Sequence, residues 1–304
     1  MKKISRRSFL AAAGLSVAAL ALTACGGSSA STASSVASSA ASSEAASTSA
    51  AAGELATVEA GKLTMATNAA FPPYEMTTDA GEFEGIDIET AQAIADKLGL
   101  ELQIDDMDFD AALLSVQQGK ADIVMAGVTV TDERKAVMDF SDSYATGIQS
   151  IIVPEGSDIA SPDDLAGKKI GTQRGTTGYI YCSDDFGDEN VVAYDDGLTA
   201  VQALNNGQVD AVVIDNAPAQ EFIAANPGLK ILDTSYAEED YAIGMAKGSS
   251  LEDAVNAALK ELKADGTLQS IDRKSTRLNS SHVSESRMPS SASCWRRGSR
   301  HTRA

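Results

Sequence analysis

The chain has 304 residues, with 24 basic and 43 acidic side chains and a formal net charge of −19 at pH 7. Residues 1–25 contribute +4 and residues 272–304 contribute +6, which leaves −29 for the segment between them. So acidic a segment repels polyanions, and we expect neither nucleic acid nor anionic lipid headgroups as its partners.

The N-terminal residues are typical of an export signal that ends in a lipidated cysteine. Four basic residues precede an uncharged stretch, 11–24, that is shorter than a membrane span of about 20 residues. We expect residues 1–24 to be a signal peptide and Cys25, which ends the run LTAC, to be acylated. The run SRRSFL (5–10) resembles a twin-arginine signal, and an ordinary Sec signal is the alternative.

The segment after the cysteine consists mostly of Ser, Ala, Thr and Gly up to about residue 53. This composition offers no apolar periodicity and predicts a flexible coil that spans about 30 Å. We therefore expect residues 25–57 to tether a folded body to lipid outside the cytoplasm, on the outer face of the membrane or in the periplasm.

The C-terminal segment 272–304 is rich in Ser and Arg and holds both histidines and the only tryptophan. Its runs DRKSTRLNSSH and SRMPSSA resemble the translation of a DNA-sequencing adapter. We expect a foreign tail in place of the native C-terminus; a natural basic tail that binds nucleic acid is the alternative.

Between these ends, strand and helix patterns alternate, which is typical of parallel sheets with crossover helices. The first half predicts strands at 62–67, 100–105 and 121–126 and helices at 91–98 and 110–118. The second half predicts strands at 168–173, 191–194 and 209–214 and helices at 177–183, 198–205 and 217–225. A last helix has its apolar side chains on one face between Leu251 and Leu262.

The runs GKADIVM (119–125) and GQVDAVV (207–213) are similar, and each follows an amphipathic helix and leads into a buried strand. They indicate two similar α/β lobes. Ligands of open α/β sheets bind beyond the carboxyl ends of the strands, which selects residues 127–134 and Asp215.

At this level of detail the chain resembles the bacterial extracellular solute-binding proteins of the polar amino-acid class, which serve ABC importers. The motifs that carry the resemblance are ATNAAFPPYEM (66–76), GIDIETAQAIADKLG (85–99), MDFDAALLSVQQGKADIVMAGVTVTDERK (107–135), MDFSDSY (138–144), GTQRGTTG (171–178) and VDAVVID (209–215).

The resemblance implies the two-lobed type II periplasmic-binding-protein fold with two hinge strands, near 145–149 and 238–243. Residues 58–147 with 242–271 would form lobe 1, and residues 148–241 lobe 2. It further implies a monomer that closes on a free amino acid and presents it to an ABC permease, without a cofactor or metal.

The residues at the matched positions suit such a ligand. Arg134 offers a planar, permanently charged fork for the α-carboxylate; a surface salt bridge with Asp132 or Glu133 is the alternative. Thr129 offers a hydroxyl and an amide, and Gly127 a backbone that a ligand approaches closely.

In the second lobe, Thr176 and Thr177 open a helix whose free amides face the same carboxylate. Asp215 would bind the α-ammonium group, unless it serves only as a helix cap.

By resemblance, Phe71 and Phe109 would sandwich the ligand side chain, with Tyr74 a weaker candidate and core packing the alternative. Asn68 stands where relatives often carry Asp. If Asn68 faces the ligand side chain, its neutrality favours a neutral polar ligand such as glutamine over arginine or lysine.

Two other functions are compatible with the fold. A dehydratase would need an acid or base over its ligand, but the body contains no histidine, and lone Cys182 is expected to be half-buried without a disulfide partner. A sensory ligand-binding protein would need a membrane segment after the body, which the sequence does not show.

Replacement of Cys25 by serine tests the lipid anchor. We expect Cys25→Ser to abolish acylation and to release the exported protein, because the tether offers no other apolar group that holds lipid. Fractionation of cells and medium measures this, with Ser28→Ala as the control. Retention of the Cys25→Ser protein in the membrane fraction would rule out Cys25 as the anchor.

Overall fold

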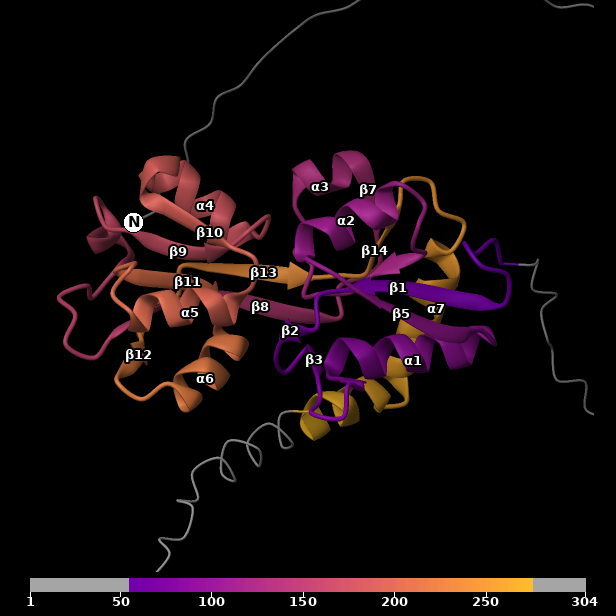
Figure 1. Cartoon of the computed structure of the whole chain (residues 1–304). Coiled ribbons are helices and arrows are strands. Elements are labelled where there is room, and N and C mark those ends of the chain that lie inside the picture. Colours follow the sequence, from indigo (N-terminus) through magenta and orange to yellow (C-terminus); the bar gives the residue numbers. More distant parts are fainter. Residues whose placement is uncertain (1–54, 276–304) are drawn as a thin grey trace, which may run out of the picture. The chain divides into compact units, whose positions relative to one another are not determined.

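The computed structural model describes residues 55–275, which form two α/β lobes (Figure 1). The expected signal peptide, Cys25, most of the tether and the tail from residue 276 lie outside the described residues, so the predictions for them stay predictions.

Lobe 1 is built on a five-stranded sheet with the order β5-β1-β6-β14-β7. Its strands are β1 (Lys62–Thr67), β5 (Glu101–Asp106), β6 (Ile123–Val124), β7 (Met138–Phe140) and β14 (Gly244–Ala246). A small sheet adds β2 (Ala70–Phe71), β3 (Glu75–Thr77) and β4 (Phe83–Glu84). The helices of this lobe are α1 (Ile86–Leu98), α2 (Phe109–Gln117), α3 (Asp132–Val137) and α7 (Glu252–Ala264).

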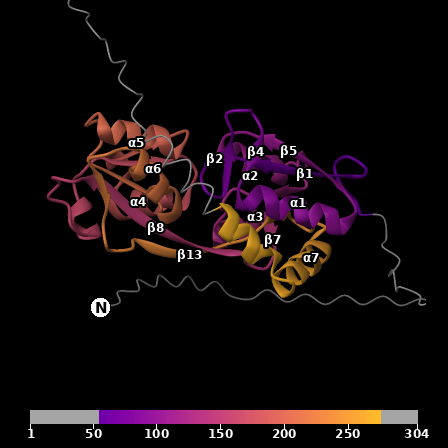
Figure 2. The ribbon, with the colours of Figure 1, turned by 90° about the horizontal axis from the view of Figure 1, so that it is seen from below.

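Lobe 2 is built on the sheet β10-β9-β11-β8-β12, with β13 paired to β8. Its strands are β8 (Ala145–Pro154), β9 (Ile170–Gln173), β10 (Val191–Tyr194), β11 (Ala211–Asp215), β12 (Leu229–Ile231) and β13 (Ala237–Tyr241). Its helices are α4 (Thr177–Phe186), α5 (Gly197–Asn205) and α6 (Asn216–Ala225), with short 3₁₀ turns η1 (Pro162–Leu165) and η2 (Asp188–Asn190). The two lobes appear again in Figure 2, seen from below.

The expectation of parallel sheets is correct for only three strands of each lobe. These are β5-β1-β6 and β10-β9-β11, whereas β14 and β8 join them antiparallel. The extra strands belong to the chain where it passes between the lobes, so they run against the crossover units. Strand β6 is shorter than the expected strand 121–126, because it pairs with β1 and β14 only over Ile123 and Val124.

The repeated motif has a structural cause. Gly119 and Gly207 both adopt left-handed backbone, with φ of 67° and 68°, at the turn after a helix. The aspartate three residues later accepts a backbone hydrogen bond at the start of the neighbouring strand: Asp122 from Thr64 N (2.7 Å) and Asp210 from Lys169 N (2.8 Å). Each motif therefore fixes the start of one strand against the next.

The hinge consists of β8 and β13, which pair antiparallel from Ala145↔Tyr241 to Gln149↔Ala237 (Figure 2). These are the segments in which the two hinges were expected. The hydrogen-bonded pair carries the chain from lobe 1 into lobe 2 and back, so the lobes share a two-stranded connection.

The end of the described chain packs on lobe 1. Residues 267–275 are helical, Ser275 is buried, and Lys274 Nζ lies 2.8 Å from Glu89 Oε1. The first four residues of the segment interpreted as a foreign tail thus continue this helix. Within residues 55–275 no helix has the length and apolarity needed to cross a membrane.

The structure corrects one expected exposure. Cys182 is fully buried in the lobe 2 core with Ile151, Ile170 and Val213, rather than half-buried. Burial raises the pKa of its thiol to about 12, so the side chain stays protonated and packs as a small apolar group.

Gly147 in β8 leaves no room for a side chain. A Cβ atom there would lie 2.5 Å from the buried ring of Tyr241 and 2.7 Å from Asp215 Oδ2. We expect Gly147→Ala to lower the free energy of unfolding by about 1–3 kcal/mol through overpacking, measured by urea denaturation. Gly156→Ala is the control, since nothing lies within 4 Å of a Cβ there. Equal stability of the two variants would contradict the prediction.

Candidate functional site

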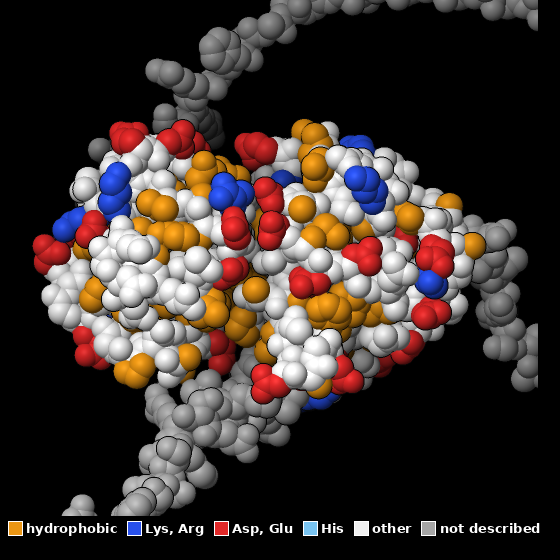
Figure 3. All heavy atoms as spheres, viewed as in Figure 1, with side chains coloured by type: hydrophobic (Ala, Val, Ile, Leu, Met, Phe, Trp, Pro, Cys, Tyr) orange, Lys and Arg blue, Asp and Glu red, His pale blue; other side chains and the backbone are white. Residues whose placement is uncertain are grey.

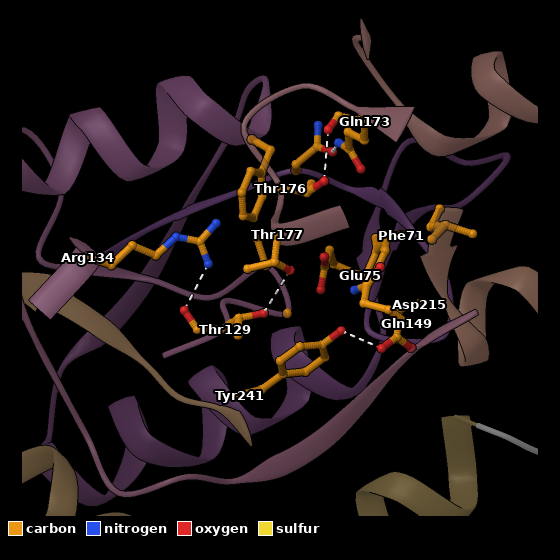
Figure 4. Close-up of a pocket in the computed structure, with 15 residues that line it drawn as sticks. Phe71, Glu75, Thr129, Arg134, Gln149, Gln173, Thr176, Thr177, Asp215 and Tyr241 are labelled. Carbon is orange, nitrogen blue, oxygen red and sulfur yellow. Dashed lines mark hydrogen bonds between the residues drawn. The ribbon is translucent and has the colours of Figure 1, made fainter. Parts of the chain in front are cut away.

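A cavity is lined by residues of both lobes and the hinge (Figure 4). All nine residues predicted to bind the ligand line this cavity: Asn68, Phe71, Phe109, Gly127, Thr129, Arg134, Thr176, Thr177 and Asp215.

Arg134 is held in place by two backbone carbonyls. Its Nη1 donates to Thr129 O (2.8 Å) and its Nη2 to Gly175 O of the other lobe (3.1 Å), while the guanidinium lies 5.4 Å from the centre of the Phe109 ring. These contacts, and not a salt bridge with Glu133, position the side chain. Arg134 is only 8% exposed, so its charge acts in a largely dehydrated setting.

The start of α4 faces the cavity opposite Arg134. Thr176 is the N-cap of this helix, and its hydroxyl accepts from Tyr179 N (3.3 Å). The hydroxyl of Thr177 lies 3.4 Å from that of Thr129, across the interface of the lobes. A helix N-terminus with free amide groups favours a negative charge.

Asp215 caps helix α6 and also lines the cavity, so the cap does not turn its side chain away from the site. Its Oδ1 accepts from Ala217 N (3.0 Å), and its Oδ2 accepts from Ile148 N (2.8 Å) and the Tyr241 hydroxyl (2.7 Å). Burial raises the pKa of Asp215, and these three donors act in the opposite direction.

The aromatic residues predicted to surround the ligand side chain also pack against one another. Phe71 stacks on Tyr74 with a centroid distance of 5.8 Å, and Tyr74 itself packs edge-on against Tyr241, behind the cavity. Gly127 has a φ of 56° and a Cβ there would lie 3.0 Å from the Phe71 ring. Its N–H donates to Asp87 Oδ2 (3.0 Å), so this amide serves the protein rather than facing the cavity unpaired.

Asn68 connects the two lobes. Its Nδ2 donates to Met107 O (2.9 Å), and its Oδ1 accepts from Gln173 Nε2 of lobe 2 (2.8 Å). Both amides line the cavity, and the lobes are therefore joined over it by this bond and by the Arg134–Gly175 bond. The arrangement is a closed one.

Four polar residues that line the cavity were not among the predicted ligand-binding residues: Glu75, Gln149, Gln173 and Tyr241. Glu75 is the most consequential, because it is completely buried and its carboxyl group points into the cavity beside Phe71 (Figure 4). Its signal in the sequence is an acid within the aromatic and proline-rich run FPPYEM. The expectation of a neutral ligand, which rested on Asn68, did not take this acidic residue into account.

Beside Glu75 lies Asp87, a fully buried acid on α1 whose N–H donates to Tyr74 O (2.8 Å). Asp87 Oδ2 also accepts from Gly127 N (3.0 Å) and from the Tyr144 hydroxyl (2.8 Å). Burial and the charge of Asp87 raise the pKa of Glu75 well above its usual value. Burial raises the pKa of Asp87 to about 6.

Several buried acceptor oxygens around the cavity have no donor among the described residues. Those on residues that line the cavity are both carboxyl oxygens of Glu75 and Oε1 of Gln149; Oδ1 of Asp87 and Oε1 of Glu239 lie on residues outside the lining. Glu239 lies on β13 and accepts through its other oxygen from Thr129 Oγ1 (3.1 Å) and Gln149 Nε2 (3.0 Å). Buried acceptors without donors are costly, so the cavity favours a ligand that is rich in N–H groups.

Two α/β lobes that close over such a cavity, joined by a pair of hinge strands, define a binding protein of the periplasmic type, which holds a small solute between its lobes. The chain belongs to the bacterial extracellular solute-binding proteins, family 3, whose model matches residues 63–276.

Relatives with curated functions are substrate-binding proteins for amino acids. The L-cystine-binding protein TcyJ of Escherichia coli is 33% identical over 221 residues, which cover 71% of this chain and 83% of that protein. The arginine-binding extracellular protein ArtP of Bacillus subtilis is 33% identical over 223 residues, 70% of this chain and 85% of that protein. This chain is accordingly a substrate-binding protein of the amino-acid ABC importer class.

Solved structures agree with this assignment. An ancestral arginine-binding protein is 42% identical in complexes with arginine and with glutamine, with TM-scores of 0.67 and 0.68. The matches cover 70% and 71% of this chain and 97% and 98% of that protein.

Proposed function

We propose that this protein captures a free amino acid with a cationic side chain, of the arginine type, and delivers it to an ABC permease. The observation that supports the cationic side chain is the buried acid Glu75, which lines the cavity together with acceptor oxygens that lack donors. The exposed surface is acidic as well (Figure 3). Its long-range field is screened beyond about 8 Å at physiological salt, so the cavity residues decide selectivity.

The charges in the cavity suit the three charged groups of such a ligand. Figure 4 shows Arg134 on one side of the cavity and the carboxyl groups of Glu75 and Asp215 on the other. We assign the α-carboxylate to Arg134 and to the N-terminus of α4, and the α-ammonium group to Asp215. The side chain would then pass between Phe71 and Phe109 and bring its cationic end to Glu75.

A neutral polar ligand such as glutamine is the second candidate. Asn68 and Gln173 supply amide groups at the cavity, and the ancestral relative is known in a complex with glutamine as well as with arginine. A neutral amide offers fewer N–H donors than a guanidinium to the acceptor oxygens of Glu75 and Gln149, which is why we place arginine first.

We propose a binding function without catalysis, outside the cytoplasm. Residues 55–275 contain no histidine, and the carboxyl group of Asp215 is held by fixed hydrogen bonds. Curated relatives are transport proteins rather than enzymes. Acylation of Cys25 would keep the protein at the membrane that holds the permease, as a monomer.

A ligand panel with a matched variant tests the proposed ligand. Thermal shifts with the twenty amino acids, citrulline, ornithine and cystine should be largest for arginine, because at equal concentration the ligand with the lowest Kd stabilises the protein most. Ligand at about 100 times its Kd adds about 2.7 kcal/mol to the free energy of unfolding. We expect Glu75→Gln to weaken arginine binding by about 2–5 kcal/mol and to affect citrulline much less. Glu221→Gln, on the outer part of α6, serves as control. Tighter binding of glutamine than of arginine by the unmodified protein would overturn the cationic ligand.

Arg134 and Arg174 provide a second matched comparison, since one is buried at the cavity and the other is half exposed in a salt bridge with Asp195. We expect Arg134→Ala to weaken amino-acid binding by about 2–5 kcal/mol, because the ligand carboxylate would lose a buried charged partner. Arg174→Ala should change it by less than about 1 kcal/mol. Calorimetric titration measures both, and equal affinities would remove Arg134 from the site.

A further inference from the structure

Glu75 and Asp87 form a pair of buried carboxyl groups without a cation beside them. Both are 0% exposed, and neither carboxyl oxygen of Glu75 nor Oδ1 of Asp87 has a hydrogen-bond donor among the described residues. The charge of Asp87 raises the pKa of Glu75, so the two groups favour holding one proton between them. The charge of a third acid, Asp106 at the end of β5, also raises the pKa of Glu75. Two adjacent buried carboxylates cannot both ionise without a large cost.

The donors around the pair determine which member holds the proton. Asp87 receives hydrogen bonds from Gly127 N and from the Tyr144 hydroxyl, so its charge is stabilised. No described residue donates a hydrogen bond to either carboxyl oxygen of Glu75. The proton therefore resides on Glu75, the member that lines the cavity.

We propose that Glu75 and Asp87 share one proton in the empty cavity and that a cationic ligand side chain displaces it, so that arginine binding releases a proton to the solvent. This inference rests on the proposed function and adds Asp87 as a positioning residue that acts on the ligand through Glu75. The O–H bond of the Glu75 carboxyl group breaks, its proton passes to water or buffer, and the carboxylate pairs with the guanidinium.

The groups that face the pair from neighbouring elements leave Glu75 as the source. Tyr144, which precedes β8, and Tyr74 both keep their protons, because burial raises the pKa of each phenol. Arg134 lies across the cavity and stays charged. Asp215 on β11 also faces the cavity, but it would meet the α-ammonium group that every amino acid carries.

A comparison of arginine with citrulline separates protons released by Glu75 from protons released by Asp215. The two have the same length and the same α-groups, but only arginine has a cationic end. Neither titrates its side chain between pH 5.5 and 8, so a difference in released protons comes from the carboxyl group that meets the side chain.

The sign of the pH dependence follows from linkage. A cation nearby lowers the pKa of Glu75, so the ionised form binds arginine more tightly than the protonated form. Arginine affinity should rise with pH, by up to about tenfold per pH unit, until the pH passes the pKa of Glu75 in the empty cavity. Citrulline affinity should stay constant or fall, since a protonated Glu75 donates a hydrogen bond to the neutral ureido oxygen.

The experiment is calorimetric titration at pH 6 in two buffers of different ionisation enthalpy, which counts protons. We expect arginine to release about one proton more than citrulline. This difference should vanish in Glu75→Gln and should persist in Glu221→Gln. It should shrink in Asp87→Asn, because the variant removes the neighbouring charge that helps burial to raise the pKa of Glu75. Glu221 is a matched control because its pKa is also raised by burial, away from the cavity.

Two results would overturn the inference. Arginine binding with the same proton count as citrulline, and with constant affinity from pH 5.5 to 8, would refute it and leave the proposed ligand standing. Binding of glutamine but not of arginine would refute both. If Asp87→Asn does not fold, the unmodified protein and Glu75→Gln still decide the question.

Discussion

The buried carboxylate of Asp215 is the point on which the hinge and the cavity jointly depend. It accepts hydrogen bonds from Ile148 on β8, from the Tyr241 hydroxyl at the end of β13 and from Ala217 in the first turn of α6. A buried carboxylate without such donors costs several kcal/mol. The register of the hinge strands and the shape of the cavity are therefore set by the same contacts. Tyr241 and Asp215 pack directly against the backbone of Gly147, where a side chain would not fit.

The fold was largely predictable, because its units repeat and have local signals. Helix α1 ends at Gly99, which adopts left-handed backbone, and the motifs at Gly119 and Gly207 mark equivalent turns in both lobes. The antiparallel strands were not predictable as such. Short strands such as β7 and β14 have no period of their own and form because segments distant in the sequence meet in one sheet.

The site was predictable where function needs a residue type with few other uses. Arg134 and Asp215 follow buried strands, and the rule for open α/β sheets places them at a common edge. Glu75 and Asp87 were missed because burial of an acid is a tertiary property. Glu75 lies on a three-residue strand, too short to reveal which face is buried, and Asp87 follows Ile86 at the start of a helix, where acids are common.

The discontinuous layout of lobe 1 has a consequence for how the chain reaches its native state. Leu63 on β1 and Leu259 on α7 belong to one hydrophobic core, although nearly the whole described chain separates them. Lobe 2 is made from one continuous stretch, so it is able to form while synthesis continues. Lobe 1 must wait for α7, and its apolar surface stays open until then. Long-range closure of this kind slows folding, so lobe 1 is the later of the two lobes to acquire a closed core.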